Sequence, residues 1–320
     1  MQAFIIRRLL IALPVTLLIT LIMFVIINLT PGDPIDMFVG QQGLKPDEME
    51  RLRVDLGLNE PVYVRYVKWL GQLFQGNLGY SYLDNQPVIH RLAERLGPTL
   101  SLMIFVILLS HAIALPIGVL SAIRQYSWID YLATGIAFFG VSFPNFFAGL
   151  VAIYVFSLSL GWLPTGGLET MGAGFSVADR LYHLLLPGMV LAFREMGVLV
   201  RYTRSSMLDV IRQDYVRTAR AAGLSEWSVT FRHGLRNALL PLITMLGLMI
   251  PRLFAGVVII EQIFQWPGMG RLAIEAILSR DYPVLMGLTL TSAVAVLVGN
   301  LLADILYAMA DPRIRLSEKR

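Results

Sequence analysis

The sequence has 320 residues, of which 56% are hydrophobic and only 15% are charged, and its formal net charge is +4. Soluble proteins carry roughly 25% charged residues, so this composition excludes an ordinary soluble domain. The chain has no cysteine, which excludes disulfides, thiolate metal sites and a thiol nucleophile. So small a positive charge is better explained by basic loops on one side of a membrane than by nucleic-acid binding.

Long apolar blocks predict membrane-spanning helices. Residues 9–29 and 131–160 contain no Asp, Glu, Lys or Arg. About 20 apolar residues, rising about 1.5 Å each, cross a hydrocarbon core of about 30 Å. The six spans expected from hydropathy are residues 9–29, 99–122, 131–160, 181–200, 238–260 and 284–303. The expected fold class is therefore an all-α polytopic membrane protein with about six transmembrane helices.

The first block follows Arg7 and Arg8, as the apolar core of a signal peptide would. It is too long for such a core, and no Ala-x-Ala-like cleavage site precedes the Thr-Pro-Gly-Asp-Pro string at 30–34. We therefore expect a retained first helix.

The long loop that follows, residues 30–98, is expected to be structured. Pro46 followed by two acids is typical of a helix first turn, and Gly57 of a helix end. A second, amphipathic helix is expected from Pro61 onward. Two interpretations stay open: helices that lie at the outer membrane interface, or a docking surface for an external partner. Residues 1–95 are expected to form one region, the first transmembrane helix with a structured periplasmic loop.

The distribution of basic residues predicts the orientation. With the N-terminus inside, the inner segments hold 14 Lys or Arg, seven of them arginines between residues 201 and 236. The short outer loops hold only Arg180, Arg271 and Arg280. The 30–98 loop carries seven basic and nine acidic residues, but long loops cross largely regardless of charge. Both termini are therefore expected to be cytoplasmic, with 311–320 as a cytoplasmic tail.

The third inner segment, residues 201–241, predicts a helix, a glycine stop and a second short helix. The apolar residues that share one face of the first helix are Met207, Leu208, Ile211, Tyr215, Ala219 and Ala222. Gly223 is expected to end that helix, and the Ser225 hydroxyl to cap the next one, which carries Trp227, Phe231 and Leu235. Such an elbow suits a soluble partner that grips it. An ordinary basic loop is the alternative.

Several short sequence motifs, taken in their order along the chain, indicate a family resemblance. Arg217, Thr218 and Ala219 are followed by three residues and then Gly223. The further strings are Thr-Pro-Gly-Asp-Pro at 30–34, Thr-Arg-Ser-Ser-Met-Leu at 203–208, Arg-Asn-Ala-Leu-Leu-Pro at 236–241, Phe-Gln-Trp-Pro-Gly-Met-Gly at 264–270 and Arg-Asp-Tyr-Pro at 280–283. Together they resemble binding-protein-dependent ABC importer permeases, whose coupling loop reads Glu-Ala-Ala, three residues, then Gly. Here the Glu and the first Ala are replaced, as in the dipeptide/oligopeptide/nickel branch, and the strings resemble its B-type subunit.

The resemblance implies a type I ABC importer permease fold over residues 96–310, with a cytoplasmic coupling loop at 201–241. It also implies the partners: a homologous second permease, two ATPase subunits, an external solute-binding protein and membrane lipid. The implied ATPase-coupling residues are Arg217, Thr218, Ala219, Gly223, Leu224, Ser225 and Arg236. The chain has no Gly-x-x-x-x-Gly-Lys-Ser/Thr loop for ATP phosphates. It is therefore expected to be a transport subunit and not an enzyme, with no cofactor of its own and with ATP and Mg on its partners.

Ionisable residues inside membrane spans are rare and usually face a cavity or a partner. The candidates for the substrate path are Arg194, Glu195, Asn145 and Arg252. One hypothesis is that Arg194 or Arg252 meets a carboxylate of the solute. The alternative is that these arginines pair with acids such as Glu195 or Glu261 and hold helices together.

Two smaller features are open at this point. Trp128 and Asp130 lie between the second and third spans, where they are either ATPase contacts or, for Trp128, an interfacial anchor. The four histidines are scattered without metal-ligand spacing, so no metal site is expected.

The function implied by the resemblance is ATP-coupled import of di- or oligopeptides across a bacterial inner membrane. Glutathione, nickel chelates, opines and oligosaccharides are alternatives within the same family, and a peptide-sensing or peptide-resistance assembly is another. A secondary transporter or channel without ATPases is the alternative from a different class, which inverted repeats or a midplane ion site would favour.

Overall fold

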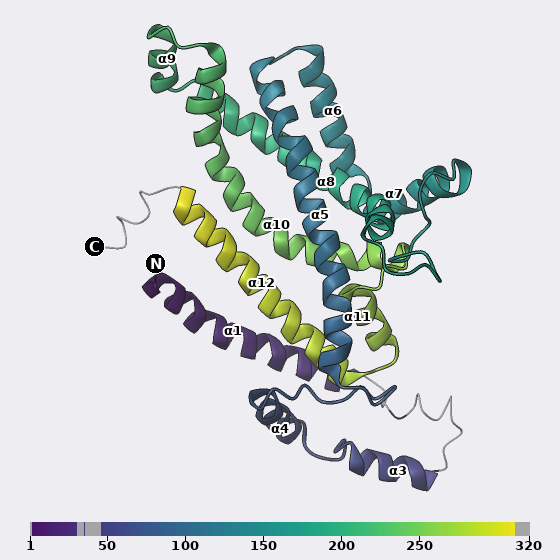
Figure 1. Ribbon diagram of the computed structural model, residues 1–320. Helices are drawn as coiled ribbons and strands as arrows, with labels where there is room; N and C mark the ends of the chain where they lie inside the picture. The colour runs from purple at the N-terminus through teal and green to yellow at the C-terminus, as the bar shows by residue number, and fades with distance from the viewer. Residues whose placement is uncertain (1, 31–34, 36–45, 311–320) are drawn as a thin grey trace. The chain divides into compact units, whose positions relative to one another are not determined.

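The computed structural model describes residues 2–30, 35 and 46–310 of the chain (Figure 1). Within those ranges there is no β-strand, and only an isolated antiparallel bridge between Tyr80 and Pro87 accompanies the helices. The side chains that lie outside this description are those of residues 2–9, 46, 52, 233, 240, 244, 248, 251, 252, 255, 256 and 306–310. The predicted all-α class is confirmed.

The chain divides into two compact units. The first comprises residues 1–98 and 267–298, and the second comprises residues 99–266 and 299 onward. The helices of the first unit are α1 (Gln2–Leu29), α3 (Pro46–Asp55), α4 (Val62–Phe74), α11 (Met269–Leu278) and the N-terminal parts of α5 (Val88–Ile123) and α12 (Tyr282–Ala310).

In the first unit, α4 packs on α1. The Tyr66 hydroxyl lies 3.1 Å from Thr20 Oγ1, and the Phe24 and Tyr66 rings pack with centroids 5.2 Å apart. The buried apolar core includes Ile27, Leu78, Val88, Leu92, Leu272 and Val284. The helices expected near Pro46 and after Pro61 are both present, so the 30–98 loop is structured where it is described.

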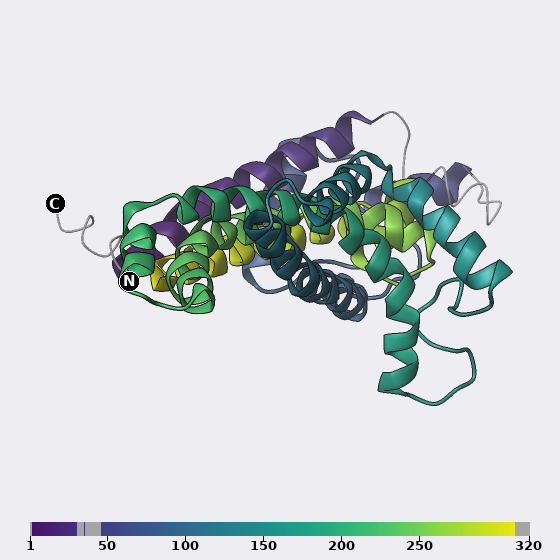
Figure 2. The ribbon, with the colours of Figure 1, turned by 90° about the horizontal axis from the view of Figure 1, so that it is seen from above.

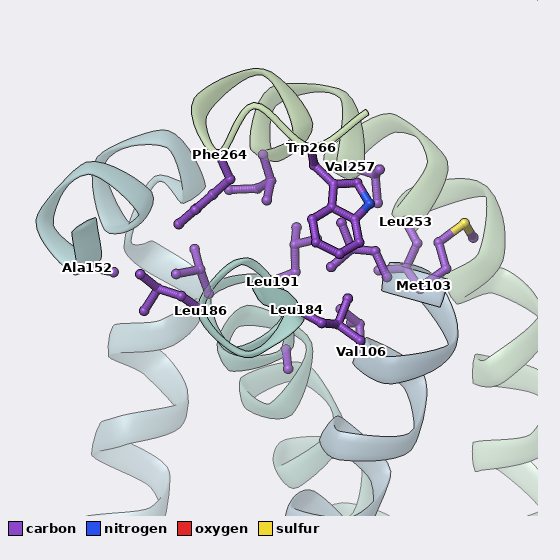
Figure 3. Close-up of a cluster of buried hydrophobic side chains, with 14 of the residues drawn as sticks. Met103, Val106, Ala152, Leu184, Leu186, Leu191, Leu253, Val257, Phe264 and Trp266 are labelled. Atoms are coloured by element: carbon purple, nitrogen blue, oxygen red, sulfur yellow. The ribbon is translucent and has the colours of Figure 1, made fainter. Parts of the chain in front are cut away.

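The second unit carries the remaining helices. They are α6 (Trp128–Ser142), α7 (Asn145–Ala152), α8 (Val177–Ile211), α9 (Asp214–Ala221), α10 (Arg236–Ile263), the π-helical segments η1 (Ile153–Ser159) and η2 (Ser228–Leu235), and the C-terminal parts of α5 and α12. Its core brings together side chains of α5, α8 and α10 with the residues just after α10 (Figure 3). Trp266 is 1% exposed there and Phe264 is fully buried.

The predicted spans correspond to helices. Four helices are long and apolar enough to cross a membrane over the described side chains, or five if one bent pair counts as a single span. The four are α1, α5, α8 and α12. The expected span 238–260 lies in α10, which is one continuous helix with seven side chains outside the description. Along α1, Leu10, Leu13 and Leu18 are more than half exposed, as lipid-facing residues are.

The expected span 131–160 is bent. Helix α6 and the α7–η1 segment meet at 102° (Figure 2 shows them from above). The break falls at Phe143 and Pro144, which are both extended, with ψ of 124° and 129°. A proline disfavours helical geometry in the residue before it, so Pro144 accounts for the break.

The prediction that one helix runs from Met207 to Ala222 is wrong, because the helix breaks between them. Helix α8 ends at Ile211, and Gln213 is extended with ψ of 148° before α9 begins. The apolar spacing continues through this break. Periodicity therefore could not reveal that the chain turns between α8 and α9 (Figure 1).

Candidate functional site

The predicted elbow is present as α9, a tight turn and η2. Gly223 follows α9 with φ of +77°, as expected for its role. The Leu224 amide donates to the Ala219 carbonyl over 3.3 Å, and the Gly223 amide donates to the Arg220 carbonyl over 3.0 Å. This is the Schellman arrangement, which favours glycine at the left-handed position. A Cβ atom at Gly223 would meet nothing within 4 Å, so the need for glycine comes from φ and not from crowding.

Polar contacts close the turn on its other side. The Ser225 hydroxyl accepts a hydrogen bond from the Ser228 amide over 3.4 Å, which is the capping role predicted for it. Across the turn, the Arg220 guanidinium grips Glu226, with Nε 2.9 Å from Oε1 and Nη2 3.3 Å from Oε2. The elbow is therefore a defined turn and not an unstructured basic loop.

A small apolar cluster seats the elbow on the helix that leads to it. Val216 and Ala219 of α9 and Val229 of η2 are buried together, with Val210 of α8 against them. Of the residues predicted to share one helical face, Ala219 is buried but Tyr215 is 42% exposed. The break after α8 rotates α9, so Val216 takes the inward position in place of Tyr215.

The outer surface of the elbow is apolar and basic. Trp227 is 71% exposed and stacks on Phe231, with ring centroids 4.9 Å apart, and Leu224 is 43% exposed. Arg217 and Arg236 are exposed. Exposed aromatic and arginine side chains are enriched at protein interfaces. This surface has the composition of a docking site.

Two other predicted coupling residues, Thr218 and Arg217, are exposed on the elbow but also contact Asp214 within α9. Thr218 is exposed, but its hydroxyl donates back to the Asp214 carbonyl over 2.9 Å. Arg217 lies 3.8 Å from the Asp214 carboxylate, in a pair that is 73% and 98% exposed. Such a pair contributes little to stability.

The predicted substrate-path residues lie on different helices of the second unit. Arg194 is exposed and Glu195 half-buried on α8, while Asn145 is half-buried at the start of α7. The Arg252 side chain lies outside the described residues. Glu261, the suggested partner of an arginine, is fully buried and accepts a hydrogen bond from the Thr99 hydroxyl over 2.6 Å.

Sequence reasoning missed the burial of two carboxylates. Asp130 is 3% exposed and binds Arg204, so it is not a surface contact for an ATPase, whereas Trp128 is 73% exposed. Asp281 is fully buried in the first unit and accepts a hydrogen bond from the Ser81 hydroxyl. Burial raises the pKa of the Asp281 carboxyl above its ordinary value. The Arg-Asp-Tyr-Pro string at 280–283 was the available signal for Asp281.

The first unit contains a cavity of about 800 Å³. It is bounded by α1, α3 and α4 and by the start of α12, and its wall combines aromatic rings with charged side chains. Prominent lining residues are Phe24, Asp55, Glu60, Lys68, Tyr80 and Tyr282. Among the described residues no group of three His, Asp or Glu could hold a metal ion.

Known protein families match both parts of the chain. Residues 114–316 match the family described as the inner membrane component of binding-protein-dependent transport systems. Residues 1–103 match the N-terminal region of the membrane component of such systems. The two matches together span nearly the whole sequence.

Curated relatives cover the chain from end to end. It is 51% identical to the oligopeptide transport system permease protein AppB of Bacillus subtilis strain 168, over 98% of this chain and 99% of that one. It is 44% identical to a putative peptide permease of Brucella suis, over 99% and 100%. It is 40% identical to the di/tripeptide transport system permease DppB of Pseudomonas aeruginosa, over 98% and 99%.

A solved structure shares the fold. The inward-facing methionine ABC transporter MetNI contains a chain that superposes with a TM-score of 0.55 at 15% identity, covering 70% of this chain and 97% of that one. The fold is therefore that of a type I ABC importer permease. Together with the family match over residues 114–316, this shows that the chain is a membrane permease belonging to the family of binding-protein-dependent transport system inner membrane components.

Proposed function

We propose that this chain is one permease subunit of an ATP-driven importer that moves di- and oligopeptides across a bacterial inner membrane. The observation that carries the peptide assignment is 51% identity, over 98% of the chain, to a relative named as an oligopeptide permease. Glutathione, nickel chelates, opines and oligosaccharides are the competing solutes.

The proposed assembly supplies what this chain lacks. A homologous second permease would complete the pathway, two ATPase subunits would hold ATP and Mg, and an external binding protein would deliver the peptide. The exposed Leu224, Trp227 and Phe231 and the exposed arginines of the elbow support an ATPase docking role. ATP would then act by binding one conformation of the assembly better than the other.

The proposed orientation places both termini and the elbow in the cytoplasm. The excess of basic residues in the segments around the elbow supports it. In the same frame, residues 1–95 form the first transmembrane helix and periplasmic loop, 96–310 the importer core and 311–320 a tail, which lies outside the described residues. The cavity of the first unit would face the periplasm, where an external partner docks.

Arg194, Glu195, Asn145 and Arg252 are proposed to line the substrate path. Arg194 is exposed on α8 in this chain alone, which leaves its charge available to a solute or to the second permease. Substituting Arg252→Gln is expected to reduce uptake of peptides with a free carboxylate while assembly is unaffected. Full uptake by that variant would remove Arg252 from the path.

The first experiment is purification of the chain from its native membrane in nanodiscs, followed by an ATPase assay. Co-purification of a second permease and ATPases, with hydrolysis stimulated by a dipeptide-loaded binding protein, is the expected result. Stimulation by a loaded binding protein with another solute, but not with peptide, would change the substrate class. A chain that purifies alone and moves solute in liposomes without ATP would contradict the importer assignment.

A further inference from the structure

A buried carboxylate joins three helices of the second unit. Asp130, in the first turn of α6, is 3% exposed. The Arg204 guanidinium on α8 donates from Nε to Oδ1 over 2.6 Å and from Nη2 to Oδ2 over 2.7 Å. The Ser121 hydroxyl of α5 also donates to Oδ1, and the Tyr126 amide donates to Oδ2 over 2.9 Å. One side chain therefore holds the end of α5 and the start of α6 to α8.

The same three helices are in close contact elsewhere. A Cβ atom at Gly118 of α5 would lie 2.5 Å from Thr203 Cβ on α8. One at Gly197 of α8 would lie 2.5 Å from the Ala137 carbonyl oxygen on α6. Packed interfaces of this kind switch between discrete arrangements and do not deform continuously. The C-terminal part of α5 therefore forms one rigid group with α6 and α8, the three-helix body.

The elbow connects directly to this body. Arg204 lies about two turns before α8 ends at Ile211, and α9 begins three residues later. The elbow rests on the same stretch of α8 through Val210. A displacement of α9 therefore reaches the three-helix body through the last turns of α8, where Arg204 is anchored.

We propose that Asp130 and Arg204 are positioning residues for energy coupling, which make the elbow and the three-helix body move together. Without the Asp130–Arg204 pair, the end of α8 would shift against α6 when the elbow moves, and the movement would not reach the membrane helices. Compared with an apolar pair of similar size, a buried ion pair often adds no net stability. Its bidentate geometry does fix the position and rotation of α8 against α6. The inference rests on the proposed function in one respect, that an ATPase binds the elbow.

The test uses the complete importer in liposomes, with peptide uptake and ATP hydrolysis measured on the same preparation. Arg204→Gln and Asp130→Asn are each expected to lower the peptide moved per ATP by at least about fivefold, the lower range of coupling between sites. Hydrolysis is expected to continue, and Arg204→Lys is expected to restore part of the ratio because it keeps the charge.

The matched control is Arg201→Gln. Arg201 lies nearly one turn earlier on α8 and packs 4.8 Å from the Phe138 ring of α6, but it does not bind Asp130. Its loss is expected to leave the transport-to-hydrolysis ratio unchanged. Because each single variant leaves one charge unpaired, either the buried Asp130 or the half-buried Arg204, the double variant Asp130→Asn with Arg204→Gln supplies a neutral pair that preserves folding. It is expected to show the same fall in the ratio.

The remaining outcomes are decisive. An unchanged ratio in the single and double variants overturns the proposal. So does a parallel fall of assembled complex, uptake and hydrolysis in all of them, because that result marks a purely structural pair. Failure of the wild-type chain to bind any ATPase would contradict the proposed function, and this inference with it.

Discussion

Of the helices that end in the same backbone turn, three have different residues at its left-handed position. These are Gly223, Gln265 and Arg280, with φ of +77°, +48° and +52°. In each turn the following amide bonds to the carbonyl five residues before it; the pairs are Leu224 with Ala219, Trp266 with Glu261, and Asp281 with Ala276. A left-handed conformation costs a non-glycine residue about 1–2 kcal/mol. The surroundings of Gln265 and Arg280 must offset that cost, whereas the exposed elbow uses glycine.

Replacing Gly223 tests this reasoning at the elbow. Gly223→Ala is expected to destabilise the turn by about 1 kcal/mol because of the left-handed φ alone. Asparagine tolerates this conformation, so Gly223→Asn is expected to cost less. Hydrogen exchange at the Leu224 amide measures the local opening. Equal protection in all three proteins would show that the turn does not depend on φ at this position.

Asp281 predicts a pH dependence. Its fully buried carboxyl has a raised pKa, because desolvation outweighs the hydrogen bonds from Ser81, Tyr82 and Val284 and the charge of Arg91. The folded protein therefore binds this proton more tightly than the unfolded chain does. The stabilisation of the folded state by this proton is complete at low pH. It is lost as pH rises from the ordinary carboxyl pKa of about 4 through the raised value.

Thermal unfolding in detergent between about pH 4 and pH 7 checks that sign. The stability of Asp281→Asn relative to wild type is expected to improve as pH rises. Asp84 is the control, because burial raises its pKa but hydrogen bonds from Gln86, Arg91 and Ser81 together lower it below the ordinary value. Asp84→Asn is expected to change little relative to wild type over the same range, because a lowered carboxyl pKa alters stability only below about pH 4. Parallel curves for the two variants would contradict the assignment.

At the scale of elements, glycine contacts set how closely α6 and α8 approach. Gly197→Ala places a methyl group against the backbone of Ala137 and is expected to cost about 1–3 kcal/mol. Gly135 lies on α6, as Ala137 does. A methyl group at Gly135 would meet nothing within 4 Å. Gly135→Ala is therefore expected to be neutral or slightly stabilising. Thermal stability of the purified protein distinguishes the two, and equal losses would show that the contact at Gly197 can relax.

The elements that local chemistry specifies could be predicted from the sequence. Pro46, Gly57 and Gly223 mark helix ends by backbone preferences that act within a few residues, and the structure confirms those ends. The break at Gln213 could not be predicted, because no glycine or proline marks it and the apolar spacing continues through it. Pro144 is visible in the sequence, but the 102° angle depends on the packing that follows.

At the scale of the whole molecule, the absence of cysteine makes orientation directly measurable. Met171 is 99% exposed in the loop before α8, and Gln213 is exposed at the elbow. In spheroplasts, an impermeant maleimide is expected to label Met171→Cys at once and Gln213→Cys only after permeabilisation. The reverse pattern would overturn the proposed orientation.

The Asp130–Arg204 pair belongs to this largest scale. The two residues are 74 positions apart, and neither carries a local signal that names the other. Sequence reasoning placed Asp130 in a loop and Arg204 in a family string, but their pairing depends on how α5, α6 and α8 pack. The shape of the elbow could be predicted because its contacts are local, whereas the Asp130–Arg204 pair could not.

The short range of those elbow contacts has an evolutionary consequence. The bonds that shape the turn, from Ala219 to Val229, join residues within the same short segment. The conformation of such a segment depends mainly on its own residues. We therefore expect that it can be exchanged as a unit between related permeases. Exchange of this segment between related permeases is therefore expected to change the exposed side chains of Leu224 and Trp227 while the turn keeps its shape.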